Sequence, residues 1–188
     1  MQQFDGIIGK SMLVSGLDSA GLLAIQAAIR WGASRVVGVD VSAKRIEYAR
    51  SLGLGEIMHA GDLGEARFEL GYDCAGSMLS VENVLEHVVE HIVVFDALQD
   101  DVVYRKEWWG KGKRLETYNA RPFNERDCNL MIDLVVNKGV DMKCLFTHRI
   151  PFARYSEVVD TLINQGGVKV LFYPGIDFAS STCSTDVG

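Results

Sequence analysis

The sequence contains no apolar run that approaches the roughly 20 residues needed to cross a bilayer. Its N-terminus has neither the basic region nor the apolar stretch of a secretory signal. The four cysteines are scattered without a CxxC pair, which favours neither a structural zinc knot nor a disulfide framework. These absences predict a reduced, cytoplasmic protein with no membrane partner. The cysteines are Cys74, Cys128, Cys144 and Cys183.

An excess of basic charge is also absent, because 19 Lys and Arg face 25 Asp and Glu, a formal net charge of −6. An electrostatic nucleic-acid binder needs a basic face, so we expect no nucleic-acid partner. The length of 188 residues and a hydrophobic content of 48% suit one globular domain. We expect this domain at residues 1–174, with residues 145–174 leaving it and residues 175–188 forming a disordered tail.

Short apolar runs alternate with amphipathic stretches over the first hundred residues. This rhythm predicts βαβ units and therefore an α/β fold, a Rossmann doubly wound parallel sheet with helices on both faces. Residues 108–118 are expected to be an extended edge segment. The expected strands are residues 12–14, 35–40, 57–59, 72–74, 92–95 and 168–172, and the expected helices are residues 20–31, 43–52, 81–89, 126–137 and 155–164.

A glycine-bearing turn joins the first expected strand to the first expected helix, where a dinucleotide-binding loop belongs. Gly16 suits the tight turn, and Gly21 suits a close approach of helix and strand. The helix N-terminus would present N–H groups to a pyrophosphate. Asp18 replaces the middle glycine of GxGxxG, so we expect Asp18→Gly to tighten NAD binding by removing charge repulsion. The candidate loop is Gly16, Leu17, Asp18, Ser19, Ala20 and Gly21.

An acidic residue closes the second expected strand. Asp40 follows Gly16 at close to the roughly 20 residues expected in the dinucleotide-binding fingerprint. Its carboxylate can accept hydrogen bonds from the adenosine ribose and would repel a 2′-phosphate, which favours NAD over NADP. The alternative is an acid that only complements the dipole of the next helix.

The sequence from about residue 9 to residue 174 resembles the medium-chain dehydrogenase/reductase family, especially its sorbitol and threonine dehydrogenase-like branch. The most specific element is Thr-His-x-x-Pro at residues 147–151, followed by a helix and a Lys-Val strand. The other segments that carry the resemblance are residues 21–26, 32–34, 39–45 and 72–77.

The resemblance implies a role for several residues. Gly16 and Gly21 would flank the pyrophosphate of NAD, and Asp40 would bind the ribose. Arg45 would pack along the adenosine. The further cofactor contacts implied are Ala75 and Gly76, which would line the cleft, and Phe95, which would lie near the nicotinamide.

The family carries its zinc ligands and most substrate contacts in an N-terminal domain that precedes the coenzyme domain. No Cys or His of this chain matches a zinc-ligand position, so we assign it no catalytic or metal-binding residue. The resemblance implies an NAD-binding half of a zinc-type alcohol or polyol dehydrogenase, inactive without a zinc domain that could be a separate chain. It also implies a homodimer through the edge strand between Trp109 and Thr117.

Two other functions fit parts of the pattern. An S-adenosylmethionine-dependent methyltransferase also needs an acid such as Asp40 for its ribose, and it would tolerate Asp18 because its cofactor has no pyrophosphate. A non-catalytic nucleotide-sensing or dimerisation module would explain the altered glycine loop. His87 and His91 could chelate a metal if they shared one helix, but no third ligand accompanies them.

Overall fold

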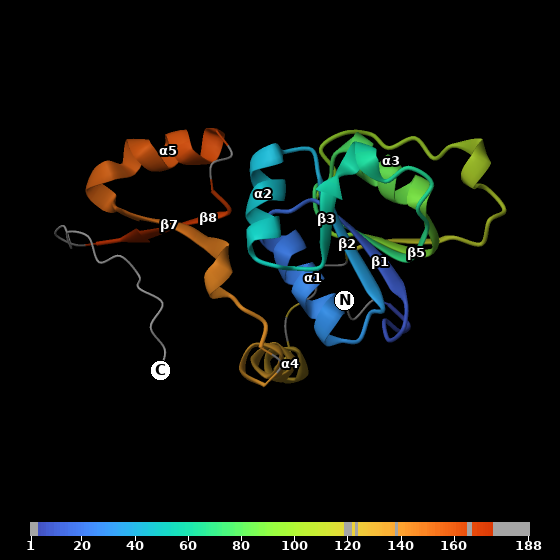
Figure 1. The fold of residues 1–188 in the computed structure, drawn as a ribbon, viewed down its shortest axis with the longest axis horizontal. Helices are drawn as coiled ribbons and strands as arrows, with labels where there is room; N and C mark the ends of the chain where they lie inside the picture. The colour runs from blue at the N-terminus through green and yellow to red at the C-terminus, as the bar shows by residue number, and fades with distance from the viewer. Residues whose placement is uncertain (1–3, 119–121, 123, 138, 165–166, 175–188) are drawn as a thin grey trace. The chain divides into compact units, whose positions relative to one another are not determined.

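The computed structural model describes residues 4–118, 122, 124–137, 139–164 and 167–174 (Figure 1). The chain divides into two compact units, Met1–Leu145 and Phe146–Gly188. The disordered tail expected at residues 175–188, which includes Cys183, lies outside the described residues.

The first unit is built on six parallel strands in the order β3-β2-β1-β4-β5-β6. This is the strand order of a doubly wound sheet, and the predicted Rossmann fold is confirmed. The strands are β1 (Ser11–Ser15), β2 (Arg35–Asp40), β3 (Glu56–His59), β4 (Phe68–Asp73), β5 (Val88–Val94) and β6 (Arg114–Thr117).

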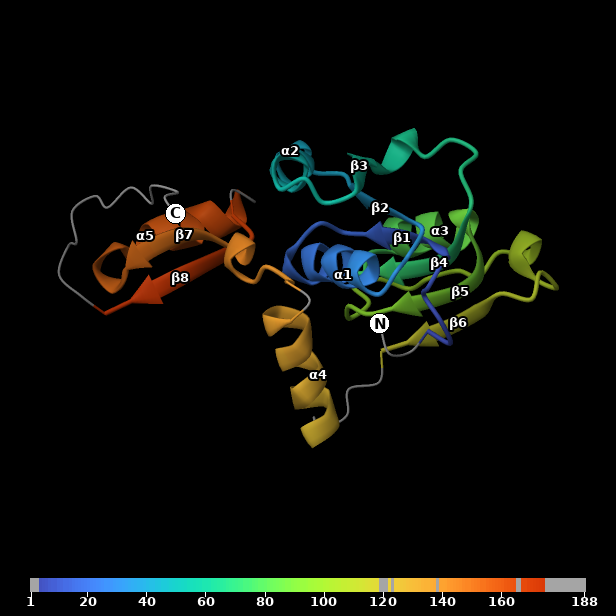
Figure 2. The same ribbon diagram turned by 60° about the horizontal axis from the view of Figure 1, so that its bottom comes forward.

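Helices cover both faces of this sheet, as predicted. Figure 2 shows α1 (Ser19–Arg30) and α3 (Met78–His87) on opposite sides of the central strands. Met12, Leu13 and Val14 of β1 are all completely buried, because a strand covered on both faces has no side open to water. The remaining helix between strands of the sheet is α2 (Ala43–Ser51).

Two strands begin earlier than their apolar runs indicate. β4 starts at Phe68, four residues before the expected start at residue 72. Glu69 interrupts the apolar pattern there, but its carboxylate accepts hydrogen bonds from the N–H and the hydroxyl of Ser11, both at 2.6 Å. β5 starts at Val88, directly after α3 ends at His87.

His87 and His91 therefore lie on different elements. His87 ends α3, and its Nδ1 is 2.8 Å from the carbonyl oxygen of Asn83. His91 lies on β5, where its Nε2 is 3.6 Å from a carboxylate oxygen of Glu116. The shared helical face that a chelating pair would need is absent here, because the helix stops between the two residues.

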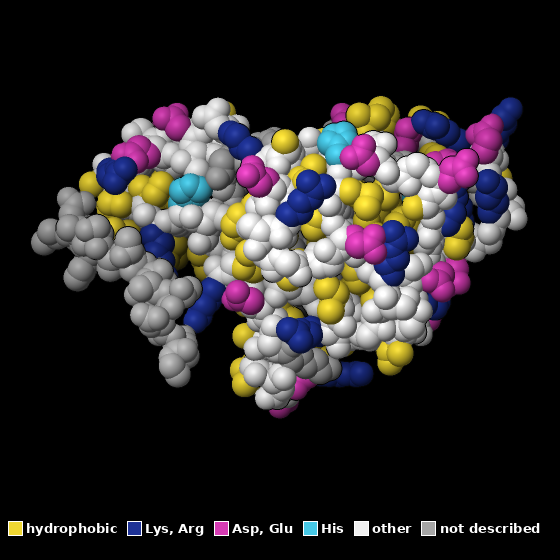
Figure 3. Space-filling view, viewed as in Figure 1, with side chains coloured by type: hydrophobic (Ala, Val, Ile, Leu, Met, Phe, Trp, Pro, Cys, Tyr) yellow, Lys and Arg dark blue, Asp and Glu magenta, His cyan; other side chains and the backbone are white. Residues whose placement is uncertain are grey.

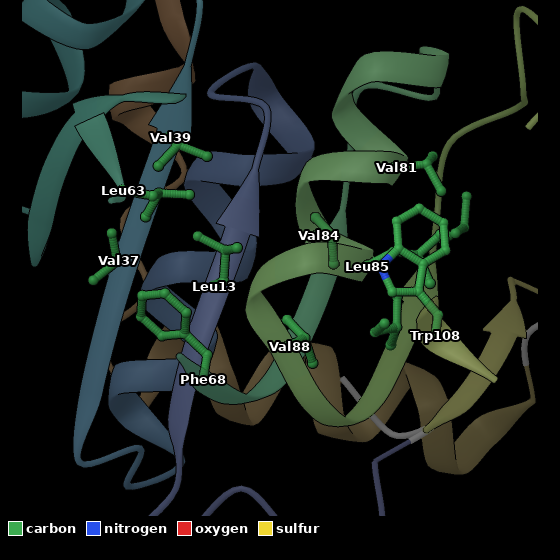
Figure 4. Packing of buried hydrophobic residues seen from close by; sticks show 12 residues of the cluster. Leu13, Val37, Val39, Leu63, Phe68, Val81, Val84, Leu85, Val88 and Trp108 are labelled. Carbon is green, nitrogen blue, oxygen red and sulfur yellow. The ribbon is translucent and has the colours of Figure 1, made fainter. Parts of the chain in front are cut away.

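Of the extended edge segment expected at residues 108–118, the stretch in β6 is confirmed as the edge strand, whereas the segment between β5 and β6 is not continuously extended. It contains a short 3-10 helix, η2 (Lys106–Trp108), before β6 begins. Trp108 is 2% exposed and packs in the core with Val81 and Leu85 of α3 (Figure 4). Its indole nitrogen donates to Glu86 at 3.1 Å. The neighbouring Trp109 is 73% exposed, so only one of the two tryptophans faces water.

Among the described residues, the chain after the sheet adds to the first unit the helix α4 (Glu125–Val136) and a short 3-10 helix, η3 (Lys143–Leu145). The second unit pairs β7 (Phe146–Pro151) with β8 (Lys169–Tyr173) in parallel, with α5 (Tyr155–Ile163) between them in sequence. Thr147 Oγ1 accepts the N–H of Val168 at 3.0 Å and so joins the start of β7 to the approach to β8.

Acidic and basic side chains are interspersed on the face of the first unit drawn in Figure 3, and neither sign gathers into a large patch there. Across the part of the chain that the structure describes, no helix is both long and apolar enough to span a membrane.

We predict that Trp108→Ala lowers the free energy of unfolding by about 3–5 kcal/mol, because it leaves a cavity under α3 and removes the partner of Glu86. Urea denaturation measures this loss. The matched change Leu98→Ala, at a side chain that is 50% exposed, should stay within about 0.5 kcal/mol of the wild type. Equal effects of the two substitutions would contradict the core position of Trp108.

Candidate functional site

The direction of the strand connections reverses between β1 and β4, the two central strands of the sheet. In a doubly wound sheet, ligands bind outside the carboxyl ends of the strands at this switch point. Ser15 ends β1 directly beside Asp73, which ends β4. The residues that follow these two strands therefore form the candidate site.

Gly16 makes the turn that follows β1. Its φ of +95° lies in a region that side-chain-bearing residues rarely adopt. A Cβ atom at this position would lie 3.1 Å from the carbonyl carbon of Cys74 and 3.2 Å from the nitrogen of Ala75. The loop after β4 therefore rests directly on the backbone of the loop after β1.

Gly21 lies in the first turn of α1, where the helix approaches the preceding loop. A Cβ atom there would be 1.8 Å from the carbonyl oxygen of Gly16, which is far inside any contact distance. Glycine at this position lets the helix start against the loop. Gly16 and Gly21 thus meet the steric demands of the first and third glycines of the dinucleotide fingerprint.

Asp18 occupies the middle position of the loop as the N-cap of α1. One oxygen of its carboxylate accepts the N–H of Ala20 at 2.9 Å and that of Gly21 at 3.1 Å. Aspartate is among the preferred N-cap residues, because its carboxylate satisfies donors that the helix leaves unpaired. The donors that a phosphate group would use at this helix terminus are therefore bonded to the protein's own carboxylate.

Asp40 closes β2 beside the same loop and is 7% exposed. One carboxylate oxygen accepts the N–H of Leu17 at 2.8 Å, and the other accepts the N–H of Ser42 at 2.8 Å. Since a carboxylate has about four acceptor positions, these two bonds leave capacity for ligand hydroxyl groups. The bond from Leu17 therefore joins Asp40 directly to the glycine loop.

Arg45 extends from α2 toward Asp40. Its Nη1 lies 3.7 Å from the Asp40 carboxylate. Its Nε is buried, and among the described residues it has no hydrogen-bond partner. A buried donor without a partner is unusual in a folded protein, and it makes Arg45 a candidate for a contact with a bound ligand.

Asp73 is completely buried at the end of β4 and was not among the residues singled out from the sequence. Burial raises the pKa of its carboxyl, while hydrogen bonds from Ser80 and from the loop backbone oppose that shift. It accepts the N–H of Gly76 at 2.9 Å, so it fixes the loop that rests on Gly16. A strand ending in Asp, with Gly three residues later, is the sequence pattern that could have indicated this role.

Ala75 and Gly76 form that loop, and Phe95 follows the next strand. A Cβ atom on Gly76 would lie 2.2 Å from the carbonyl oxygen of Ala97, so the loop is also packed against the segment after β5. The ring of Phe95 stacks on Tyr72 at a centroid distance of 5.5 Å and contacts Tyr118 at 4.9 Å. The structure thus places all the sequence-derived candidates at the carboxyl ends of β1, β2, β4 and β5 or on the helices that follow.

Negative charge predominates around the two central loops. Burial raises the pKa of the Cys74 thiol, and the carboxylates of Asp18, Asp73 and Asp96 raise it further. Three carboxylates therefore lie close enough to one point to act on it together. The guanidinium of Arg45 is already engaged with Asp40. The part of the site at Asp40 and Arg45 thus offers acceptors and one donor without a partner, whereas the start of α1 carries its own anion.

No family model matches the chain. Alcohol dehydrogenase 1 of Solanum tuberosum is 26% identical over 188 aligned positions, which cover 87% of this chain and 47% of the plant protein. The class-P alcohol dehydrogenase of Arabidopsis thaliana is 22% identical, with coverage of 89% and 48%. The chain spans about half the length of the curated relatives it matches.

Solved structures of dehydrogenases share the fold. L-Idonate 5-dehydrogenase of Escherichia coli superposes with a TM-score of 0.76 at 19% identity, over 91% of this chain and 52% of that one. Galactitol-1-phosphate dehydrogenase of Escherichia coli gives a TM-score of 0.71 at 25% identity, over 90% and 55%. These matches bear out the resemblance noted in the sequence: the chain is a homologue of alcohol dehydrogenases, corresponds to about half the length of these relatives, and shares its fold with solved dehydrogenase structures.

Proposed function

We propose that this chain is the coenzyme-binding half of a dehydrogenase of the alcohol and polyol type and that it binds NAD(H). The observation that carries the proposal is the buried carboxylate of Asp40, bonded to the glycine loop through Leu17, with the free Nε of Arg45 beside it. One related solved structure is described as a complex with NADH, which supports a nicotinamide cofactor.

The adenosine side of the site fits this cofactor. The remaining acceptor capacity of Asp40 suits the two hydroxyl groups of a ribose, and Arg45 would lie along the adenosine. A 2′-phosphate would face the Asp40 carboxylate and be repelled by it. NADH is therefore the preferred form over NADPH.

Chemistry on a substrate would require groups that the described residues do not bring together. Within the described ranges, no three His, Cys, Asp or Glu side chains are grouped so that they could hold a metal ion. When bound, NAD accepts or delivers a hydride, whereas a zinc ion polarises the alcohol oxygen. We propose that the zinc and the substrate contacts belong to a further domain, on the same or a separate chain, and that this half alone does not turn over alcohols.

We expect the chain to bind NADH saturably and at least about tenfold more tightly than NADPH, because the Asp40 carboxylate accepts ribose hydroxyls but repels a phosphate. Calorimetry and tryptophan quenching measure both affinities, with S-adenosylmethionine as a third ligand. If S-adenosylmethionine alone bound, the dehydrogenase proposal would be wrong at the level of its cofactor.

Asp40→Asn should weaken NADH binding by roughly tenfold or more and reduce the preference over NADPH, because it removes a charged acceptor and the repulsion of the 2′-phosphate. Glu90→Gln is the matched control, since it removes one negative charge from an exposed ion pair with Lys10, away from the loops of the site. Thermal unfolding checks that the loss of one of the two oxygens that accept the N–H groups of Leu17 and Ser42 leaves the fold intact. Unchanged NADH affinity in a folded Asp40→Asn variant contradicts the assignment.

We further propose a homodimer formed through the segment between Trp109 and Thr117. β6 is the last strand in the sheet order, and the exposed fractions of Trp109 and Leu115 are 73% and 43%. An edge strand with exposed apolar side chains is suited to pairing with another copy of itself.

Sedimentation velocity at micromolar concentration should show a dimer. Leu115→Glu should shift it to a monomer, because it places a charge in the apolar contact, whereas Val103→Glu, at a side chain that is 64% exposed outside this segment, should not. A monomeric wild type under these conditions would rule out the interface.

A further inference from the structure

The loop after β1 departs from the GxGxxG fingerprint at Asp18, which replaces the middle glycine. The Asp18 carboxylate lies at the start of α1, where a dinucleotide-binding loop receives a phosphate group of its ligand. The carboxylate of Asp18 accepts the amides of Ala20 and Gly21 at the N-terminus of α1. A phosphate group bound at a helix N-terminus uses these same first-turn amides. The two anions cannot occupy these donors together.

The surroundings give a second anion little compensation. The carboxylates of Asp18, Asp73 and Asp96 all raise the pKa of the Cys74 thiol, so negative charge already acts on this point. The nearby guanidinium of Arg45 is engaged with Asp40. A diphosphate would add its negative charges to a region where these carboxylates already act.

Backbone strain does not hold Asp18 in place. Its φ of −79° and ψ of −166° are ordinary extended values that any residue adopts. Its side chain is only half-buried, so the carboxylate has room to rotate away from the helix. The position therefore does not require glycine for its conformation, and the effect of Asp18 lies in its carboxylate.

We propose that Asp18 is an internal competitor for the phosphate position, so that a dinucleotide binds only when this carboxylate leaves the amides of Ala20 and Gly21. This inference rests on the proposed NAD(H) binding. Asp18 then determines specificity: it disfavours ligands with a diphosphate at the start of α1, whereas ligands that present only an adenosine to Asp40 and Arg45 are unaffected.

Three probes separate the two sides of the site: NADH, ADP-ribose and adenosine, which lacks the diphosphate. Asp18→Asn keeps an N-cap acceptor and removes the charge, and Asp18→Gly restores the fingerprint residue. Glu90→Gln is the charge-matched control at an exposed ion pair. Affinities are measured by calorimetry on the full chain, with circular dichroism and thermal unfolding as checks of the fold.

Asp18→Asn and Asp18→Gly should bind NADH and ADP-ribose roughly ten- to a hundredfold more tightly than the wild type, since Asp18→Gly frees the amides for the phosphate and Asp18→Asn removes the negative charge that opposes it. Adenosine affinity should stay the same in all variants, and Glu90→Gln should match the wild type for every probe. Equal NADH affinity in the wild type and both Asp18 variants would overturn the inference and leave the proposed function standing. If neither the wild type nor any variant bound NADH, the proposed function would fail, and the inference with it.

Discussion

The start of α1 lies against the turn after β1 so closely that the carbonyl oxygen of Gly16 fills the space where a side chain at position 21 would be. This approach requires glycine at position 21, and it fixes the first turn of the helix above the carboxyl end of β1. The loop after β4 packs on Gly16 from the other side, close to Cys74 and Ala75. Substitution of any of these contacts by a larger group would separate the elements that form the site.

The buried carboxylates within this arrangement accept hydrogen bonds from backbone N–H groups of the protein. Asp40 links the loop after β1 to the start of α2 through Leu17 and Ser42. Asp73 holds the neighbouring loop through Gly76. These carboxylates contribute to folding as well as to the proposed binding, so a substitution that affects ligand affinity must always be compared with its effect on stability.

The parallel sheet was predictable from the sequence, because buried strands of a parallel sheet appear as short apolar runs between amphipathic helices. The early start of β4 was not, since it depends on Ser11, which lies far away in sequence and satisfies the carboxylate of Glu69. Trp108 is buried and the adjacent Trp109 is exposed because only Trp108 packs in the core with side chains of α3. The sequence around the two tryptophans does not indicate this long-range contact. At the candidate site, the sequence revealed that a charge replaces a glycine, but only the structure places that charge on the amides of Ala20 and Gly21.

The bond between Ser11 and Glu69 joins residues that are 58 positions apart in the sequence. The two strands that carry them, β1 and β4, are the central neighbours of the sheet. Folding must therefore close a long loop, including β2, α2 and β3, before the middle of the sheet exists, and the entropy of that closure slows folding relative to proteins built from local contacts. Because the proposed nucleotide site lies at this same junction, it cannot form before this long-range pairing.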